Sequence, residues 1–183
     1  MATATRTVVT DISADWQIEF PPLKLQRPMR TLVSWTEDPA TRYYSGVASY
    51  KRNVEMKSVG ARYFLSFGVG TPVPFNDKQR GSRAWLESPV REAAEVFVNG
   101  QRVGSVWAPP YEIEITPQLK AGSNELEVRV GNLAINTLAG RSAPDYRLLN
   151  LRYGERFQPQ DMENLQPLPA GLIGSSPITV LAE

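Results

Sequence analysis

The fold is decided by residues 95–104, which have the sequence EVFVNGQRVG. Two short runs of alternating apolar and polar residues flank Asn99-Gly100 in this stretch. Asn followed by Gly supplies two residues that adopt the positive φ of a type I′ turn, and the twist of that turn matches the twist of the strands beside it. The stretch therefore predicts an antiparallel β-hairpin with a two-residue turn.

The rest of the chain repeats this pattern of short runs separated by turn residues. The 13 glycines and 15 prolines are spread along 183 residues, and no segment sustains a helical apolar period. Candidate strands lie at residues 16–20, 48–54, 63–67, 126–130 and 177–181. Short period-two segments between turns are typical of β-sandwiches and jelly rolls, so we predict an all-β fold of this kind.

The length predicts one domain, and we treat residues 1–183 as a single β-sandwich module. Three parts of it do not have a strand pattern. We expect residues 1–14 to be a flexible N-terminal segment, residues 71–89 to be an inserted loop, and residues 138–169 to be a long loop region. Loops of this length inside a domain are uncommon and are typically either functional or without fixed structure.

Charge and composition limit the classes of partner that the chain is expected to bind. The 20 Lys and Arg residues against 19 Asp and Glu residues give a formal net charge of +1, which provides no case for nucleic acid as a partner. No apolar run approaches the about 20 residues of a membrane-spanning helix, so we predict no membrane partner. The polar start has no signal-peptide pattern, although a secreted or periplasmic parent protein stays compatible with the sequence.

The absence of Cys and His excludes most forms of nucleophilic catalysis and thiolate or imidazole metal sites. Hydrolysis by carboxylates would need two of them about 5–10 Å apart, one with a raised pKa. The pairs Glu112/Glu114 and Glu125/Glu127 share strand faces, but such pairs are common on solvated sheets. Oxygen ligands for calcium occur at Asn76-Asp77 and near Asp145, without EF-hand-type spacing. We predict no cofactor, no metal and no catalysis by the chain alone.

An ordered set of motifs extends over residues 15–180. It includes Ser34-Trp35-Thr36-Glu37-Asp38, Tyr43-Tyr44-Ser45-Gly46-Val47, the Asn99-Gly100 hairpin, Gly104-Ser105-Val106-Trp107, Lys120-Ala121-Gly122-Ser123-Asn124 and Leu168-Pro169-Ala170-Gly171-Leu172. In order and spacing the set resembles the galactose-binding-like jelly roll of glycoside hydrolases, the sugar-binding domain of family 2. It is more similar still to the C-terminal β-sandwich of family 106 α-L-rhamnosidases.

This resemblance implies a non-catalytic, carbohydrate-associated module that binds an oligosaccharide or polysaccharide, or that supports the active site of a separate catalytic (β/α)-barrel. The alternative is a structural or interaction domain that binds no sugar. Residues 132–141 depart from the rhamnosidase pattern, because an aromatic residue, an Arg and an acid of that pattern are all replaced. A binding module should expose an aromatic ring beside polar groups, whereas a docking domain should expose a bare apolar patch.

Sugars are held by aromatic rings and by planar amide, carboxylate and guanidinium groups. We predict Trp16 and Trp35 in the core. For Trp107 and Tyr111 we favour packing over the sheet edge, and the alternative is stacking on a sugar. Trp85 lies in a charged loop, where it would either face a sugar or plug the loop onto the core. The candidate carbohydrate contacts are Trp85, Asn136, Arg141, Asp145, Tyr146 and Arg147.

Overall fold

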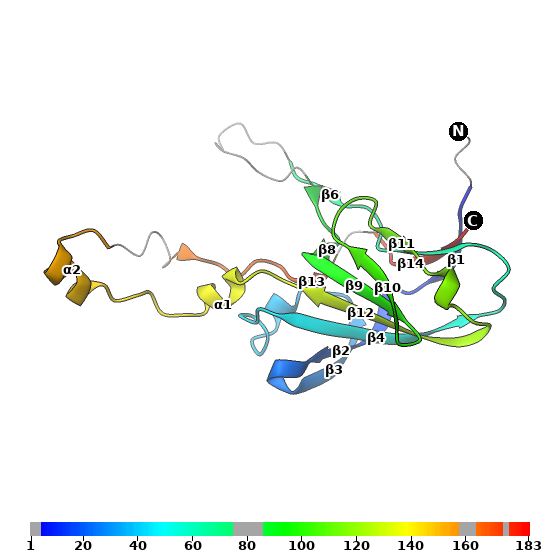
Figure 1. Ribbon diagram of the computed structural model, residues 1–183, viewed down its shortest axis with the longest axis horizontal. Helices are drawn as coiled ribbons and strands as arrows, with labels where there is room; N and C mark the ends of the chain where they lie inside the picture. Colours follow the sequence, from blue (N-terminus) through cyan, green and yellow to red (C-terminus); the bar gives the residue numbers. More distant parts are fainter. Residues whose placement is uncertain (1–4, 75–85, 158–163, 174–175) are drawn as a thin grey trace.

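The computed structural model describes residues 5–74, 86–157, 164–173 and 176–183, and it consists mainly of two antiparallel β-sheets (Figure 1). The six-stranded sheet has the order β10 (Gln101–Val106), β9 (Ala93–Val98), β12 (Gly122–Gly131), β4 (Val47–Met56), β2 (Ala14–Phe20) and β3 (Leu25–Thr31). The four-stranded sheet has the order β1 (Thr7–Asp11), β14 (Thr179–Ala182), β5 (Tyr63–Ser66) and β11 (Glu112–Glu114). The prediction of an all-β sandwich is confirmed.

Smaller elements complete the described part of the chain. Two short pairs join β13 (Gly171–Leu172) to β8 (Val90–Arg91) and β6 (Thr71–Pro72) to β7 (Leu86–Glu87). Three 3-10 turns cover Pro21–Leu23, Trp35–Glu37 and Thr116–Gln118, and the α-helices are α1 (Ile135–Ala139) and α2 (Arg147–Tyr153). Among the described helices, none is both long enough and apolar enough to cross a membrane.

The predicted hairpin is confirmed as strands β9 and β10. Asn99 and Gly100 have φ angles of 51° and 77°, and the strands pair from Gln101 opposite Val98 onward. The Asn99 amide Nδ2 donates to the carbonyl oxygen of Gln118 at 2.8 Å and to Oδ1 of Asn124 at 2.9 Å. These bonds tie the turn to the segment that enters β12, the strand on the other side of β9.

The core lies between the two sheets and is rich in aromatic residues. Trp16 is fully buried, and its indole Nε1 donates to the carbonyl oxygen of Ile12 at 2.8 Å. Phe20 packs edge-on against Trp35 and Tyr44, with ring centroids 5.4 Å and 5.2 Å away. Such T-shaped pairs add to the free energy gained from burial alone. The prediction that Trp16 and Trp35 belong to the core is confirmed.

The structure differs from the sequence prediction at three places. Residues 7–11, expected to be flexible, form β1, which pairs with β14 at the other end of the chain. The expected loop at residues 71–89 begins and ends in a strand pair, with Thr71 opposite Glu87. Tyr111 is buried as predicted, but Trp107 is 71% exposed and does not pack over the edge. Val106 faces the core, and the next side chain of an extended chain points the other way.

Candidate functional site

Four of the six candidate contacts lie on a long excursion of the chain. Between α1 and β13 the chain leaves both sheets, reaches α2 at its far end and returns (Figure 1). We call its described residues, 140–157 and 164–169, the arm. The arm carries Arg141, Asp145, Tyr146 and Arg147, while Asn136 lies in α1 at its root. Trp85 lies outside the described residues.

Asn136 holds the root of the arm together. Its side chain is only 1% exposed, its Nδ2 donates to the carbonyl oxygen of Leu168 at 2.9 Å, and its Oδ1 accepts from the Leu168 amide at 3.0 Å. The outgoing and returning parts of the arm are thereby joined by both ends of one amide. Because the amide is buried and used in this way, we leave Asn136 out of the site and assign it a structural role.

The root is also anchored to the loop before β4. Ser45 Oγ accepts from the Thr137 amide at 2.9 Å and donates to the carbonyl oxygen of Leu133 at 2.8 Å. A Cβ added to Gly140 would lie 2.5 Å from the Tyr43 ring, so the chain leaves the sandwich in close contact with that ring. The arm therefore starts from a fixed position.

The side chains of Asp145 and Arg147 pair with each other. Asp145 accepts from the Arg147 backbone amide at 3.0 Å, and the two side chains form an ion pair at 2.7 Å. The hydrogen bonds from Arg147 lower the pKa of the Asp145 carboxyl group below its usual value. Both groups are exposed, but their mutual pairing fixes the start of α2 and leaves them less free to bind sugar hydroxyls.

Aromatic rings and one amide hold the tip in shape. The Tyr146 and Tyr153 rings lie 6.0 Å and 6.4 Å from the Phe157 ring, measured between centroids. Asn150 Nδ2 donates to the Phe157 carbonyl oxygen at 2.9 Å, and its Oδ1 accepts from the Phe157 amide at 3.0 Å. Tyr146 thus supports the tip from within, and the tip has local contacts that maintain its conformation away from the sheets.

The tip presents leucine side chains to solvent. Leu148 is 81% exposed and Leu151 is 84% exposed. Residues three apart on a helix share one face, so the two side chains form a single apolar surface. Leu151 also lines a hollow of about 500 Å³ with Asn150, Phe157 and two charged residues, Arg147 and Glu155. We call the surface formed by Leu148 and Leu151 the leucine face.

Positive charge accompanies the leucine face. The described residues from 141 to 157 contain four arginines against Asp145 and Glu155. Within the described part of the chain, the side chains of Arg141 and Arg156 have no ion-pair partner, and the Arg152 guanidinium lies 5.2 Å from the centroid of the Tyr153 ring. An apolar surface bordered by basic residues is complementary to a partner surface that is apolar and bordered by acidic residues.

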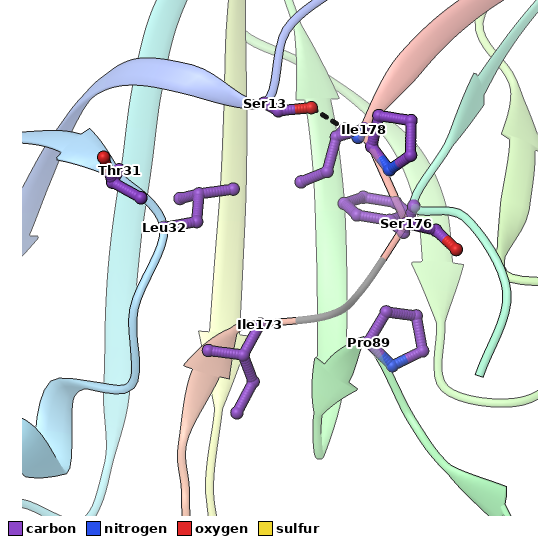
Figure 2. A pocket seen from close by; sticks show the side chains of 9 residues that line it. Ser13, Thr31, Leu32, Pro89, Ile173, Ser176 and Ile178 are labelled. Carbon is purple, nitrogen blue, oxygen red and sulfur yellow. Dashed lines mark hydrogen bonds between the residues drawn. The ribbon is translucent and has the colours of Figure 1, made fainter. Parts of the chain in front are cut away.

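A second hollow, of about 340 Å³, has Ser13, Thr31 and Ile178 among its lining residues (Figure 2). Its side chains are apolar apart from the hydroxyl groups of Ser13, Thr31 and Ser176. Ser13 Oγ accepts from the Ile178 amide at 2.9 Å and donates to Asp11 at 2.6 Å, so its hydrogen-bonding capacity is largely used. The described lining contains no ionisable side chain, and so these residues offer no group for acid–base chemistry.

The paired carboxylates are bound by arginines. Glu114 forms an ion pair with Arg62 at 2.7 Å, and the hydrogen bond from Arg62 lowers the pKa of Glu114. Burial alone would raise the pKa of Glu127, but hydrogen bonds from Arg129 and Ser49 lower it overall. A general acid needs a raised pKa, so neither pair supplies one through these residues. No group of three or more acidic side chains that could hold a metal occurs among the described residues.

The fold and the arm define the class of the chain, an all-β sandwich module that carries a long, self-supporting arm. No protein-family model matches it. Over its whole length, aligned across 213 positions, the chain is 31% identical to the protein named "Putative beta-glucuronidase" of Formosa agariphila. It spans 17% of that protein.

Solved structures place the fold among glycoside hydrolases. The rhamnosidase from Novosphingobium sp. PP1Y matches all of this chain with a TM-score of 0.71 and 26% identity, and the chain spans 16% of it. A beta-glucuronidase from Bifidobacterium dentium matches all of this chain with a TM-score of 0.59 and 20% identity, and the chain spans 30% of it. The predicted resemblance to a β-sandwich of glycoside hydrolases is confirmed, and the chain corresponds to a limited part of them.

Proposed function

We propose that the chain is a non-catalytic, carbohydrate-associated module of a glycoside hydrolase, and that it supports the active site of a separate catalytic domain through its arm. The observation that carries this proposal is the leucine face at the end of the arm. Leucines exposed to 81% and 84% on one helical face are costly in water, and exposed apolar patches mark interaction surfaces.

The construction of the arm favours docking. A surface that already has its bound shape loses less conformational entropy on binding, so its apolar contacts yield more affinity. The bonds of Asn136 at the root and of Asn150 at the tip provide this order. Glycosidases hydrolyse with a pair of carboxylates, so the region around such an active site is acidic. The arginines of the arm are complementary in charge to such a region.

Glycan capture by the tip alone is less well supported. Asp145 and Arg147 pair with each other, and Tyr146 is half-buried against Phe157. Arg141 is the candidate contact that remains both exposed and without an ion-pair partner in the described part of the chain. We assign it to the root of the arm, where a carboxylate of the catalytic domain would pair with it.

The proposal is tested in a hybrid enzyme. This chain replaces the matched 16% of the Novosphingobium rhamnosidase, with and without the double substitution Leu148→Asp/Leu151→Asp. We expect amides of α2 to be protected from hydrogen exchange in the hybrid and not in the isolated chain, with the protection lost in the double variant. Val69→Asp, at an apolar residue away from the arm that is 69% exposed, is the matched control. Hydrolysis of an aryl rhamnoside by the isolated chain, or equal protection in both variants, would contradict the proposal.

A further inference from the structure

The outer face of the six-stranded sheet contains a hollow that the arm does not touch. It has a volume of about 560 Å³. Its floor is Ser49 of β4, which lies opposite Glu19 of β2 and Arg129 of β12. A serine between two long charged side chains leaves room above it, and this room is of the size that small ligands occupy in proteins.

The polar side of the hollow is a connected network. Glu127 accepts from Ser49 Oγ at 2.8 Å and from Arg129 Nε at 3.0 Å, and Lys51 Nζ lies 3.9 Å from the same carboxylate and 3.5 Å from Glu19. The network holds two acidic and two basic groups, so its charges balance. Both oxygens of Glu127 accept hydrogen bonds from Arg129, so the groups that remain to bind hydroxyls are the Glu19 carboxylate, the Lys51 ammonium and the other N–H groups of Arg129.

The other side of the hollow is apolar and stiff. Pro21 and Pro22 of the first 3-10 turn line it, together with Val47, which is 51% exposed at the start of β4. Saccharides have apolar C–H faces beside their hydroxyl groups. A wall of proline and valine opposite a row of charged groups offers a surface to each.

Trp107 extends this surface toward the edge of the sheet. It follows β10 directly and is 71% exposed, whereas Val106 before it is buried. Alternation along an extended chain therefore directs Trp107 toward the outer face. Strand β10 lies three places from β4 in the sheet, which is about 14 Å at the usual strand spacing.

We propose that this outer face binds a neutral oligosaccharide, with one sugar in the Ser49 hollow and another stacked on Trp107. The balanced charges of the network favour a neutral sugar over a uronate, because a uronate would place an unpaired negative charge beside Glu19 and Glu127. The site goes beyond the proposed docking function and shares no residue with the arm. Binding here would keep the glycan on the module while a catalytic domain acts on it.

The test is calorimetric titration of the full chain with galactotriose, rhamnotriose and trigalacturonate. The first and third probes differ chiefly in that the carboxylates of trigalacturonate replace hydroxymethyl groups. We expect saturable binding of a neutral trisaccharide, at least about tenfold weaker binding of trigalacturonate, and a loss of about tenfold in Trp107→Ala and in Glu19→Ala. Glu125→Ala removes a same-face carboxylate of β12 outside the hollow and is the matched control.

The outcomes separate this site from the arm. Binding that survives Leu148→Asp/Leu151→Asp but is weakened by Trp107→Ala supports the sheet-face site. No binding of either neutral probe by the folded chain overturns it, as do tighter binding of trigalacturonate and a loss of binding in the arm variant alone. None of these results bears on whether the arm docks, which the hydrogen-exchange experiment on the hybrid decides.

Discussion

Replacing both tip leucines by aspartate should leave the isolated chain nearly as stable as before. Complete burial of a leucine side chain contributes about 1.5–3 kcal/mol. Leu148 and Leu151 are 81% and 84% exposed, so a fifth or less of each side chain is covered. The apolar contribution lost is therefore about 1 kcal/mol or less for both together. Substitutions in a surface that only a partner covers should change the free energy of unfolding of the isolated chain very little.

The measurement is urea unfolding followed by tryptophan fluorescence, which monitors the buried Trp16 and Trp35 in the core. Leu65→Ala is the positive control, because Leu65 is fully buried and its truncation should cost about 2–5 kcal/mol. If Leu148→Asp/Leu151→Asp costs as much as this control, the two leucines pack against the sandwich in solution. The leucine face would then not be free to dock on a partner.

Three further changes probe the root, the sheet face and the core. Asn136→Ala removes two buried hydrogen bonds and should cost about 2 kcal/mol in urea unfolding, with faster hydrogen exchange in the arm; unchanged exchange would refute the role of Asn136 as its clamp. Glu127 has a lowered folded pKa, so its charge stabilises the fold above its usual pKa of about 4.3 and this stability is lost as the pH falls through the folded value. Glu127→Gln should therefore flatten the acid limb of the stability–pH curve, and an unaltered limb would contradict the bonds from Arg129. Gly171→Ala should destabilise the fold by about 2 kcal/mol or more, because φ is 108° and the new Cβ would lie 2.3 Å from the Tyr50 hydroxyl oxygen; a calorimetric Tm equal to the parent's would refute this packing.

The sequence predicts those features that depend on near neighbours. Asn99-Gly100 defines its own turn, and alternation along residues 16–20 is sufficient to direct Trp16, Ile18 and Phe20 inward. The strand at residues 7–11 was missed because it depends on pairing with β14, more than 160 residues later in the chain. A polar, Thr-rich segment at one end has no local signal that distinguishes a strand from a flexible tail.

The candidate site shows the same division. The pairing of Asp145 with Arg147, two residues apart, could be anticipated from the sequence, whereas the bond of Asn136 to Leu168 joins residues 32 positions apart. An amide that clamps two segments and an amide that binds a sugar look identical in sequence. The outward direction of Trp107 could not be predicted from the hairpin turn, because the register shifts between Arg102 and Gly104, and this bulge is what brings Val106 opposite the buried Ala94.

The two proposed surfaces suit different tasks. Apolar contact at the leucine face provides affinity for a protein partner, whereas the balanced, hydrogen-bonding sheet face suits a hydrated glycan held weakly. Joining them in one module makes the second binding event intramolecular, so that a glycan held on the sheet face has a raised effective concentration at the docked catalytic domain. Weak binding is then sufficient, and tight binding would slow release of the cleaved chain. We therefore expect the loss of Trp107 to lower the hydrolysis rate most at low glycan concentration, and the loss of the leucine face to lower it at every concentration.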